Sequence, residues 1–350
     1  EVVRTLTLAL LCNGNVLLEG LPGTAKTRSI KTLSRVLQAS MGRIQFTPDL
    51  LPSDVTGNEV YQDNQGVSEL IFQQGPIFNE LVLADEINRA PAKVQAALLE
   101  AMEERQVTVA GKTYKLPPLF MVLATQNPIE QEGTYPLPEA QLDRFMFLIE
   151  VEYPSHEEEL RIARETTGTS KPKLNHILSG ERVQEYQELV RRIPVPDHIY
   201  DYAVEIVRKT RPGSPAAPEW INDYVGWGAG PRAVQYLILG AKARAALNGS
   251  YMARLEDIEA VASPVLNHRV LTNFAAESHV DKSIEDSSAF IKTNVLGVDV
   301  ILNILKENKK CRFVQISTDE VYGSIPIGSW TESQPLLANS PYAASKASAD

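Results

Sequence analysis

The chain has 350 residues, a formal net charge of −10 at pH 7 and 43% hydrophobic residues. This length allows two or three domains that each bury a core, and the acidic balance argues against a dedicated nucleic-acid binder. The two cysteines, Cys12 and Cys311, have no metal-ligand spacing, which indicates a reducing compartment and predicts a cytoplasmic protein. No apolar run reaches about 18 residues, so we expect no membrane-spanning helix.

The first informative stretch is Leu-Leu-Glu-Gly-Leu-Pro-Gly-Thr-Ala-Lys-Thr at residues 17–27. Residues 15–18 predict a buried strand and residues 27–40 a helix with one apolar face. A glycine-bearing loop between them directs backbone N–H groups at phosphates, so Lys26 would reach the β- and γ-phosphates and the Thr27 hydroxyl would hold Mg²⁺. The other candidate nucleotide contacts are Gly20, Pro22, Gly23, Thr24 and Ala25. Ala25 replaces the usual glycine, and an ordinary Gly/Pro turn is the alternative interpretation.

A second motif lies at the end of the apolar run at residues 81–84, which predicts another buried strand. Two carboxylates follow it, Asp85 and Glu86. Asp85 would hold Mg²⁺ through water, and Glu86 would orient or deprotonate the attacking water. Two solvated acids at a strand end are the alternative. The phosphate loop upstream favours the catalytic interpretation.

Several motifs, in order, resemble the MoxR family of AAA+ ATPases. Residues 20–27 resemble its Walker A motif, and Ala-Asp-Glu-Ile-Asn-Arg-Ala at 84–90 resembles its Walker B motif. Further matches are Phe-Thr-Pro-Asp-Leu-Leu-Pro-Ser-Asp at 46–54, Gly-Pro-Ile-Phe at 75–78 and Ala-Thr-Gln-Asn-Pro at 124–128. The resemblance covers residues 1 to about 273. It implies hydrolysis of ATP with Mg²⁺ to remodel, mature or assist metal insertion into partner proteins, a homo-hexameric ring, and partners with von Willebrand A domains.

The rest of the nucleotide-binding region follows in order. Residues 47–57 are rich in proline and aspartate and predict a loop, which the resemblance places in an insert facing the pore of the ring. Residues 72–78 predict a short turn and residues 91–105 a helix. Residues 106–116 alternate around Ala-Gly-Lys and predict a hairpin, either a structural ribbon or a substrate-facing loop. Residues 42–46, before the loop at 47–57, and residues 120–124 each predict a strand.

Two polar residues after this strand are further site candidates. Asn127 matches sensor 1, which implies that it positions the attacking water against the γ-phosphate; a turn-forming Asn before Pro128 is the alternative. Arg144 is the candidate arginine finger, which would neutralise charge on the ATP of a neighbouring subunit. Its alternative is an ion pair with Asp143 or Glu139, and Arg89 competes for the contact with the neighbour.

After residue 154 the sequence becomes helical. Helical periodicity is present at residues 157–166, 181–192, 197–210, 232–247 and 255–265, with a Pro/Gly/Ala loop at 212–218. In a MoxR-like chain these helices form the lid. Arg232 matches sensor 2, which implies contact with the γ-phosphate of the same subunit. A solvent-facing arginine is the alternative, although the helix dipole disfavours a cation at a helix start.

Residues 274–350 are instead similar to an internal part of dTDP-glucose 4,6-dehydratase, an extended short-chain dehydrogenase. The similarity rests on Arg-Phe-Val-Gln-Ile-Ser-Thr-Asp-Glu-Val-Tyr-Gly at 312–323 and Ser-Pro-Tyr-Ala-Ala-Ser-Lys at 340–346. It implies that Tyr342 is a base for hydride chemistry and that Lys346, on the same helix face, lowers its pKa and holds the nicotinamide ribose. Thr318, Asp319 and Glu320 match the substrate-polarising and dehydration acid/base positions.

This segment has no first strand and no Gly-x-Gly-x-x-Gly loop to hold NAD. We therefore expect its dehydratase-like residues to be vestigial and NAD not to bind. Residues 273–278 fit both families, which indicates an accidental fusion of two genes or sequence fragments. The chain begins at Glu1 rather than Met, which indicates a truncated start.

The expected fold is α/β: a P-loop AAA+ parallel sheet with helices on both faces, an α-helical lid and a partial Rossmann-like fragment. The expected domains are residues 1–154, 155–272 and 273–350. Two other functions stay open. One is a nucleotide-sugar dehydratase carried by the last segment. The other is a DNA-dependent AAA+ motor, in which Lys112 and Lys115 of the hairpin would enter a pore.

Overall fold

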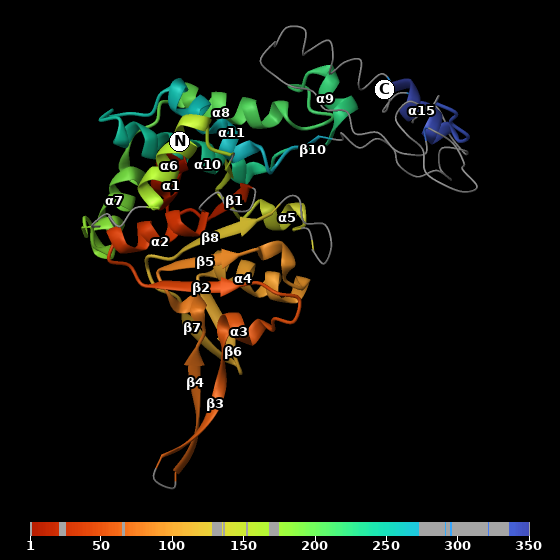
Figure 1. Ribbon diagram of the computed structural model, residues 1–350. Coiled ribbons are helices and arrows are strands. Elements are labelled where there is room, and N and C mark those ends of the chain that lie inside the picture. Colours follow the sequence, from red (N-terminus) through yellow and green to blue (C-terminus); the bar gives the residue numbers. More distant parts are fainter. Residues whose placement is uncertain are drawn as a thin grey trace. The chain divides into compact units, whose positions relative to one another are not determined.

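The computed structural model describes residues 2–20, 26–64, 67–127, 135, 137–151, 153–167, 175–272, 291, 295, 321 and 336–349 (Figure 1). The chain divides into two compact units. The first comprises residues 1–221 and 227–270, and the second comprises residues 222–226 and 271–350. The first unit contains the central sheet and most of the described helices (Figure 1).

A five-stranded parallel sheet is the centre of the first unit. Its strands lie in the order β2-β5-β8-β1-β9. They are β1 (Val16–Gly20), β2 (Met41–Gln45), β5 (Leu81–Asp85), β8 (Met121–Gln126) and β9 (Phe147–Val151). Because all pairs are parallel, the five carboxyl ends lie at one edge of the sheet.

Helices cover both faces of the sheet, as predicted. Alternate strand residues enter two separate hydrophobic clusters: Val16, Leu83 and Leu123 belong to one, whereas Leu17 and Val82 belong to the other. The first cluster includes residues of α1 (Val2–Cys12) and the lid helices, and the second includes residues of α4 (Ala92–Glu104). The α/β fold class is therefore confirmed.

Four of the five strands were predicted with ends within two residues of those observed, and β9 was not predicted. The predicted helix at 27–40 is α2 (Lys26–Val36), and the helix at 91–105 is α4, with Pro91 at its N-cap. The hairpin at 106–116 is confirmed as β6 (Gln106–Val109) and β7 (Lys112–Lys115). Its two turn residues, Ala110 and Gly111, have φ of 49° and 79°.

The segment between β2 and β5 differs from the prediction. The predicted loop at 47–57 contains α3 (Pro52–Thr56), and a long antiparallel hairpin follows, formed by β3 (Gly57–Asn64) and β4 (Val67–Gln74). This hairpin projects away from the sheet (Figure 1), and most of the predicted turn at 72–78 is strand followed by η1 (Pro76–Phe78). Phe72 fixes the base of the hairpin by stacking on Tyr114 of β7, with ring centroids 4.1 Å apart.

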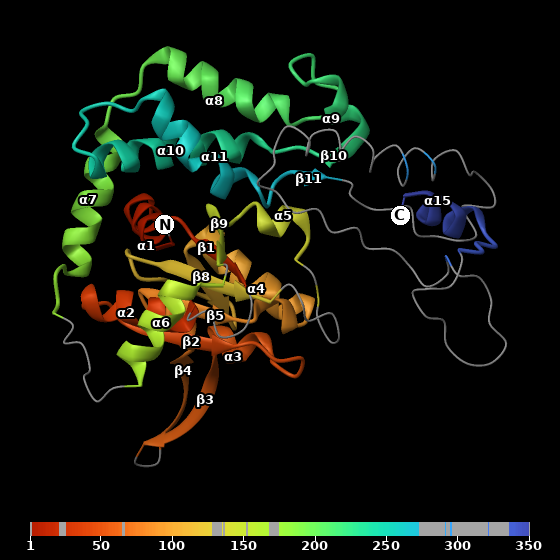
Figure 2. The same ribbon diagram turned by 45° about the horizontal axis from the view of Figure 1, so that its top comes forward.

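Among the described residues, the region from 139 to 266 contains the five predicted helices and two more. They are α5 (Glu139–Leu142) before β9, then α6 (His156–Thr166), α7 (Gly180–Arg192), α8 (Asp197–Lys209), α9 (Glu219–Tyr224), α10 (Pro231–Leu247) and α11 (Leu255–Leu266). Helix α9 was not predicted, and neither was the short α5. Helix α10 packs against α1, α7, α8 and α11 (Figure 2). Among the described residues, no helix combines the length and apolar character needed to cross a membrane.

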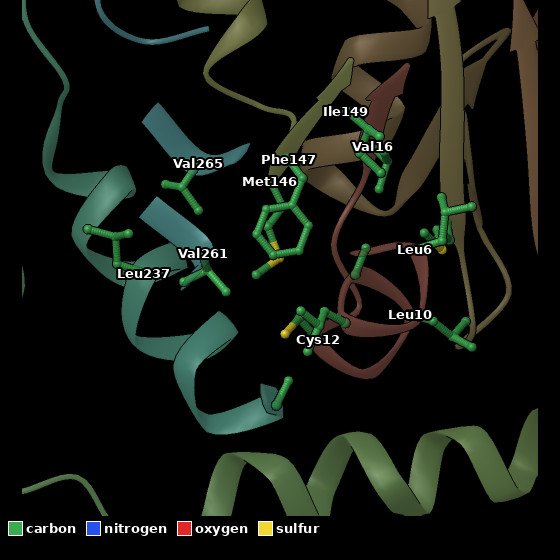
Figure 3. Close-up of a cluster of buried hydrophobic side chains, with 14 of the residues drawn as sticks. Leu6, Leu10, Cys12, Val16, Met146, Phe147, Ile149, Leu237, Val261 and Val265 are labelled. Carbon is green, nitrogen blue, oxygen red and sulfur yellow. The ribbon is translucent and has the colours of Figure 1, made fainter. Parts of the chain in front are cut away.

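The lid helices and the sheet share one core. Figure 3 shows Leu237 of α10 and Val261 of α11 beside Met146 and Phe147, which lead into β9, with Cys12 of α1 close by. All five side chains are at most 4% exposed. The contact between α10 and α11 is close, since a Cβ atom at Gly240 would lie 3.3 Å from Val261. The lid is therefore packed on the first helix and the edge strand of the sheet.

The second unit carries the dehydratase-like segment. Tyr342 and Lys346 lie on the same helix, α15 (Pro341–Ala349), as predicted. Both side chains are buried, at 9% and 8% exposed. Thr318, Asp319 and Glu320 lie outside the described residues. Strands β10 (Val225–Trp227) and β11 (Leu271–Thr272) pair as a small sheet. The expected division into three domains stays a proposal.

Candidate nucleotide-hydrolysis site

The candidate phosphate loop follows the carboxyl end of β1. β1 ends at Gly20 and α2 begins at Lys26. Pro22, Gly23, Thr24 and Ala25 lie outside the described residues, as do the side chains of Lys26 and Thr27. Gly20 has a steric role, because a Cβ atom there would lie 2.5 Å from the carbonyl oxygen of Val151 in β9. The glycine therefore lets the edge strand pass close to the start of the loop.

Asp85 lies at the same edge of the sheet, at the end of β5, and is 9% exposed. Both of its carboxylate oxygens are held. The Thr125 hydroxyl donates to Oδ1 at 2.7 Å, and the Arg43 guanidinium donates to Oδ2 at 2.8 Å. These charge-assisted bonds fix the orientation of the carboxylate.

Glu86 follows in a left-handed backbone conformation, with φ of 58° and ψ of 50°. This conformation is uncommon for a residue other than glycine and often marks a functional site. Its N–H donates to the Thr125 hydroxyl at 3.0 Å, and its Oε2 accepts from Gln45 at 3.0 Å and pairs with Arg89 at 3.3 Å. Thr125 thus holds both acids, donating to Asp85 and accepting from Glu86.

Asn127 comes directly after β8 and is buried, 8% exposed. Its carbonyl oxygen accepts from the Asn88 side chain at 3.4 Å, which links it to the turn after Glu86. Gln95 of α4 holds this turn by donating to the carbonyl of Ile87 at 3.1 Å. The Oδ1 atom of Asn88 is buried and has no partner among the described residues. The structure thus brings Asp85, Glu86 and Asn127 together at the carboxyl edge.

The oxygen donors at this edge suit Mg²⁺. Magnesium is usually bound by one or two carboxylates together with phosphate oxygens and waters, rather than by an all-protein cage. Asp85 offers an ordered carboxylate, and Thr27 lies one residue into the helix that follows β1. No cluster of three or more His, Cys, Asp or Glu side chains suited to a metal occurs among the described residues.

The two arginine candidates lie at the opposite, amino-terminal edge of the sheet. Arg144 comes three residues before β9, and the pairing of Val16 with Phe147 places the starts of β1 and β9 side by side. Arg144, Arg232 and Arg105 line a cavity of about 250 Å³ beside the start of β1. Arg105 is held by the carbonyls of Phe120 and Asn13, and burial lowers its pKa.

Among the described residues, the contacts of Arg232 lie at the amino-terminal edge of the sheet. Its guanidinium donates to Glu103 at 2.9 Å and to Asp143 at 3.3 Å, which fixes it beside Arg144. The start and the end of β1, a strand of five residues, are separated by roughly 16 Å. Arg232 is therefore held near the start of β1, and its expected contact with the γ-phosphate of its own subunit stays a prediction.

Arg144 is half-buried, and no residue among those described forms an ion pair with it. The alternative pairing with Asp143 is not formed, because Asp143 instead accepts from Arg232 and from Arg269. Arg89, the competing candidate, pairs with Glu86 at the carboxyl edge. Arg144 thus lies far from the carboxyl-edge acids of its own chain.

The comparisons with known proteins agree with this architecture. Residues 15–147 match the model of the ATPase family associated with various cellular activities (AAA). The chaperone MoxR1 of Mycobacterium tuberculosis is 44% identical over 276 residues, which cover 79% of this chain and 72% of MoxR1. This chain belongs to the MoxR family of AAA+ ATPases. The crystal structure of a proposed ATPase from Cytophaga hutchinsonii has a TM-score of 0.73 at 43% identity, covering 79% of this chain and 83% of that one.

The end of this MoxR-family chain matches a different family. Residues 252–350 match the model of GDP-mannose 4,6-dehydratase. The dTDP-glucose 4,6-dehydratase of Streptomyces griseus is 55% identical over 80 residues, which span 24% of that enzyme. The predicted resemblance of this segment is confirmed as a partial match.

Sequence reasoning missed four residues that position the site. Arg43, Gln45 and Thr125 orient the two acids, and Arg269 holds the turn that carries Arg144. The first two alternate on β2, next to β5 in the sheet, so a correct strand order would have found them. The role of Arg269 depends on a contact across 126 residues, for which the sequence has no local signal.

Proposed function

We propose that this MoxR-family ATPase hydrolyses ATP with Mg²⁺ at the carboxyl edge of its sheet. The observation that carries the proposal is the pair Asp85 and Glu86, held by the single hydroxyl of Thr125 at the end of β5. Two acids oriented differently by one side chain can perform two roles. The coupled work would be to remodel or mature partner proteins, metal insertion included.

Each residue at this edge has a distinct role in the proposal. Lys26 binds the phosphates, and Thr27 and Asp85 would hold the Mg²⁺, which supplies charge neutralisation when bound. Glu86 accepts the proton of the attacking water or orients it, and Asn127 positions that water against the γ-phosphate. Thr125 donates to Oδ1 of Asp85 and Arg43 donates to Oδ2, so both oxygens of this carboxylate are held in orientation.

The amino-terminal edge suggests that hydrolysis needs a second subunit. Arg144 and Arg232 line one cavity beside the start of β1, at the edge of the sheet opposite Asp85 and Glu86. A head-to-tail contact, which closes into a ring when repeated, would bring this edge to the carboxyl edge of the next subunit. We propose that both arginines stabilise the charge on the neighbour's ATP within a homo-hexamer. Partners with von Willebrand A domains remain a proposal from family resemblance.

The proposed role of Glu86 can be tested in the full chain. Glu86→Gln should retain ATP binding and lose hydrolysis by 10²-fold or more, because general-base catalysis typically contributes 10²–10⁴-fold. Glu104→Gln, the same change at an exposed residue of α4, is the matched control and should hydrolyse ATP like wild type. Equal turnover in wild type and Glu86→Gln would refute the assignment. Stimulation of hydrolysis by DNA would favour the DNA-dependent motor instead.

A further inference from the structure

Arg269, three residues after α11, is an arginine buried to 5% exposure that holds the turn before β9. Its Nε donates to Asp143 Oδ1 at 2.7 Å, and one terminal nitrogen donates to the carbonyls of Asp143 at 2.8 Å and Phe145 at 2.5 Å. The other terminal nitrogen donates to the carbonyls of Met146 at 3.3 Å and Val265. This nitrogen also lies 2.8 Å from Nε2 of His268, so every nitrogen of the guanidinium, with its five N–H donors, has a partner.

The held turn is the segment that carries Arg144. Residues 143–146 connect α5 to β9, and Arg144 is their second residue. Three carbonyls and one carboxylate of this short turn accept from the same guanidinium. The backbone on both sides of Arg144 is therefore fixed by a side chain of the lid.

The same contacts reach Arg232. Asp143 accepts from Arg269 through Oδ1 and from Arg232 through Oδ2 at 3.3 Å. The Arg269 guanidinium also lies 5.0 Å from the ring centroid of Tyr236, one helical turn after Arg232 on α10. Asp143 and Arg269 thus join the end of α11, the start of α10 and the turn that carries Arg144.

Stability alone is a poor explanation for this arrangement. A buried charge loses hydration, and replacing a buried ion pair by apolar residues is often neutral or stabilising. Burial lowers the pKa of Arg269, and the adjacent Asp143 opposes that effect. A different lid ion pair, Arg244 with Asp257, joins α10 to α11 without involving residues 143–146. The distinctive property of Arg269 is the turn that it holds.

We propose that Arg269 is a positioning residue for ATP hydrolysis in the neighbouring subunit. It fastens the turn at 143–146 to the lid, so that Arg144 and Arg232 move with α10 and α11 as one body. A lid movement in one subunit then changes the position of both arginines at the next subunit's nucleotide. This inference rests on the proposed function, because it requires Arg144 to act on a neighbour's ATP.

The test uses Arg269→Lys in the full chain. Lysine keeps the positive charge but offers three donors instead of a planar five-donor fork, so it cannot hold three carbonyls and a carboxylate together. We expect kcat for ATP to fall by 10- to 100-fold, since a misplacement of about 1 Å can cost 10²-fold. The KM for ATP should stay within about twofold, because the phosphate loop lies at the other edge of the sheet.

Mixing of subunits separates positioning from folding. Lys26→Ala subunits have a disabled phosphate loop but an intact arginine edge, so adding them to Arg269→Lys subunits should raise hydrolysis above the sum of the two. Arg244→Lys is the matched control, the same substitution in the ion pair with Asp257 that joins α10 to α11, and should keep kcat within twofold. Asp143→Asn is a second variant, which weakens the link to both arginines; it should show the same loss of kcat and the same recovery.

A parallel mixture of Arg144→Ala with Lys26→Ala subunits distinguishes failure of the Arg269 inference from failure of the proposed action of Arg144 on the neighbour's ATP. If Arg144→Ala recovers with Lys26→Ala but Arg269→Lys and Asp143→Asn do not, Arg269 is only structural and this inference is overturned. An Arg269→Lys kcat equal to that of Arg244→Lys overturns it as well. If Arg144→Ala itself does not recover in normal assemblies, the action on the neighbour's ATP is refuted, and the inference fails with it.

Discussion

The Thr125 hydroxyl donates a hydrogen bond of 2.7 Å to Oδ1 of Asp85 at the end of the central strands. Because the same hydroxyl accepts from the N–H of Glu86, one side chain sets the geometry of both acids. A substitution of Thr125 therefore perturbs both acids without removing either of them.

Thr125→Val should therefore lower kcat for ATP by about 10- to 100-fold with little change in KM. Valine keeps the shape of threonine but loses the hydroxyl, and hydrogen bonds to charged groups are worth about 1.5–3 kcal/mol. Thr108→Val is the matched control, since the Thr108 hydroxyl contacts only that of Thr113, on the exposed β6–β7 hairpin, among the side chains that the structure describes. Steady-state ATP hydrolysis measures both variants. A Thr125→Val enzyme with wild-type kcat would show that the hydroxyl does not orient the acids.

His268 makes the free energy of unfolding depend on pH, and the direction of this dependence follows from its pKa. Burial, together with the charge of Arg269, lowers the pKa of His268 to about 3, from 6.5 in an unfolded chain. Between these values the unfolded state binds a proton that the folded state does not, so this contribution to stability is complete above pH 6.5 and is lost as the pH falls. The slope from this residue approaches about 1.4 kcal/mol per pH unit.

Chemical denaturation at pH 7 and pH 5 measures this effect. His268→Gln should lose less stability than wild type on acidification, because glutamine does not titrate. His198→Gln, at an exposed position of α8, should keep the wild-type slope. Identical slopes for all three proteins would mean that His268 titrates normally in the folded state.

The turn of the β6–β7 hairpin contains a residue in a costly conformation. Ala110 has φ of 49°, which asparagine tolerates better, and Asn-Gly is the preferred pair for a turn with two positive φ values. Ala110→Asn should stabilise the first unit by up to about 1 kcal/mol, because the left-handed conformation costs most residues roughly 1–2 kcal/mol and asparagine less. Gly111→Ala at the neighbouring position, with φ of 79°, should destabilise it, although a Cβ atom there would meet nothing within 4 Å. Urea denaturation of both variants measures the change in the free energy of unfolding, and its sign shows whether backbone conformation or side-chain contact determines the effect.

The dehydratase-like segment is expected to bind no NAD⁺. Tyr342 and Lys346 share a helix face, but the chain has no Gly-x-Gly-x-x-Gly loop to hold the pyrophosphate. Calorimetric titration of the whole chain with NAD⁺ should show no binding, and dTDP-glucose should remain unchanged. Stoichiometric NAD⁺ binding that is lost in Lys346→Ala would contradict this expectation.

Parts of the fold were predictable because their sequence signal is local. The run at 81–84 is apolar throughout since β5 is buried on both faces, and the lid helices carry an uninterrupted helical period. The β3–β4 hairpin gave no such signal. Its strands are largely polar, and Tyr61 and Leu70 remain 66% and 61% exposed, so no buried face imposes alternation.

Asp85 and Glu86 of the candidate site were predictable, because two acidic residues directly follow an apolar run that predicts a strand. The site was not predictable where a role depends on which edge of the sheet a residue reaches. Arg232 was expected at its own phosphate loop, yet Glu103 and Asp143 hold it at the opposite edge. Arg269 follows Asn267 and His268 at a helix end, where basic residues are common and usually exposed.

The most direct test of the central claim is the ATPase rate of mixed Arg144→Ala and Lys26→Ala subunits. Each variant alone should be nearly inactive, one for lack of the arginine and the other for lack of phosphate binding. If Arg144 serves the neighbour's ATP, a mixture contains interfaces with an intact Lys26 on one side and an intact Arg144 on the other, and hydrolysis should rise toward about a quarter of the wild-type rate at equal proportions, from random pairing at each interface. A mixture that assembles normally and stays as inactive as its components would contradict the account.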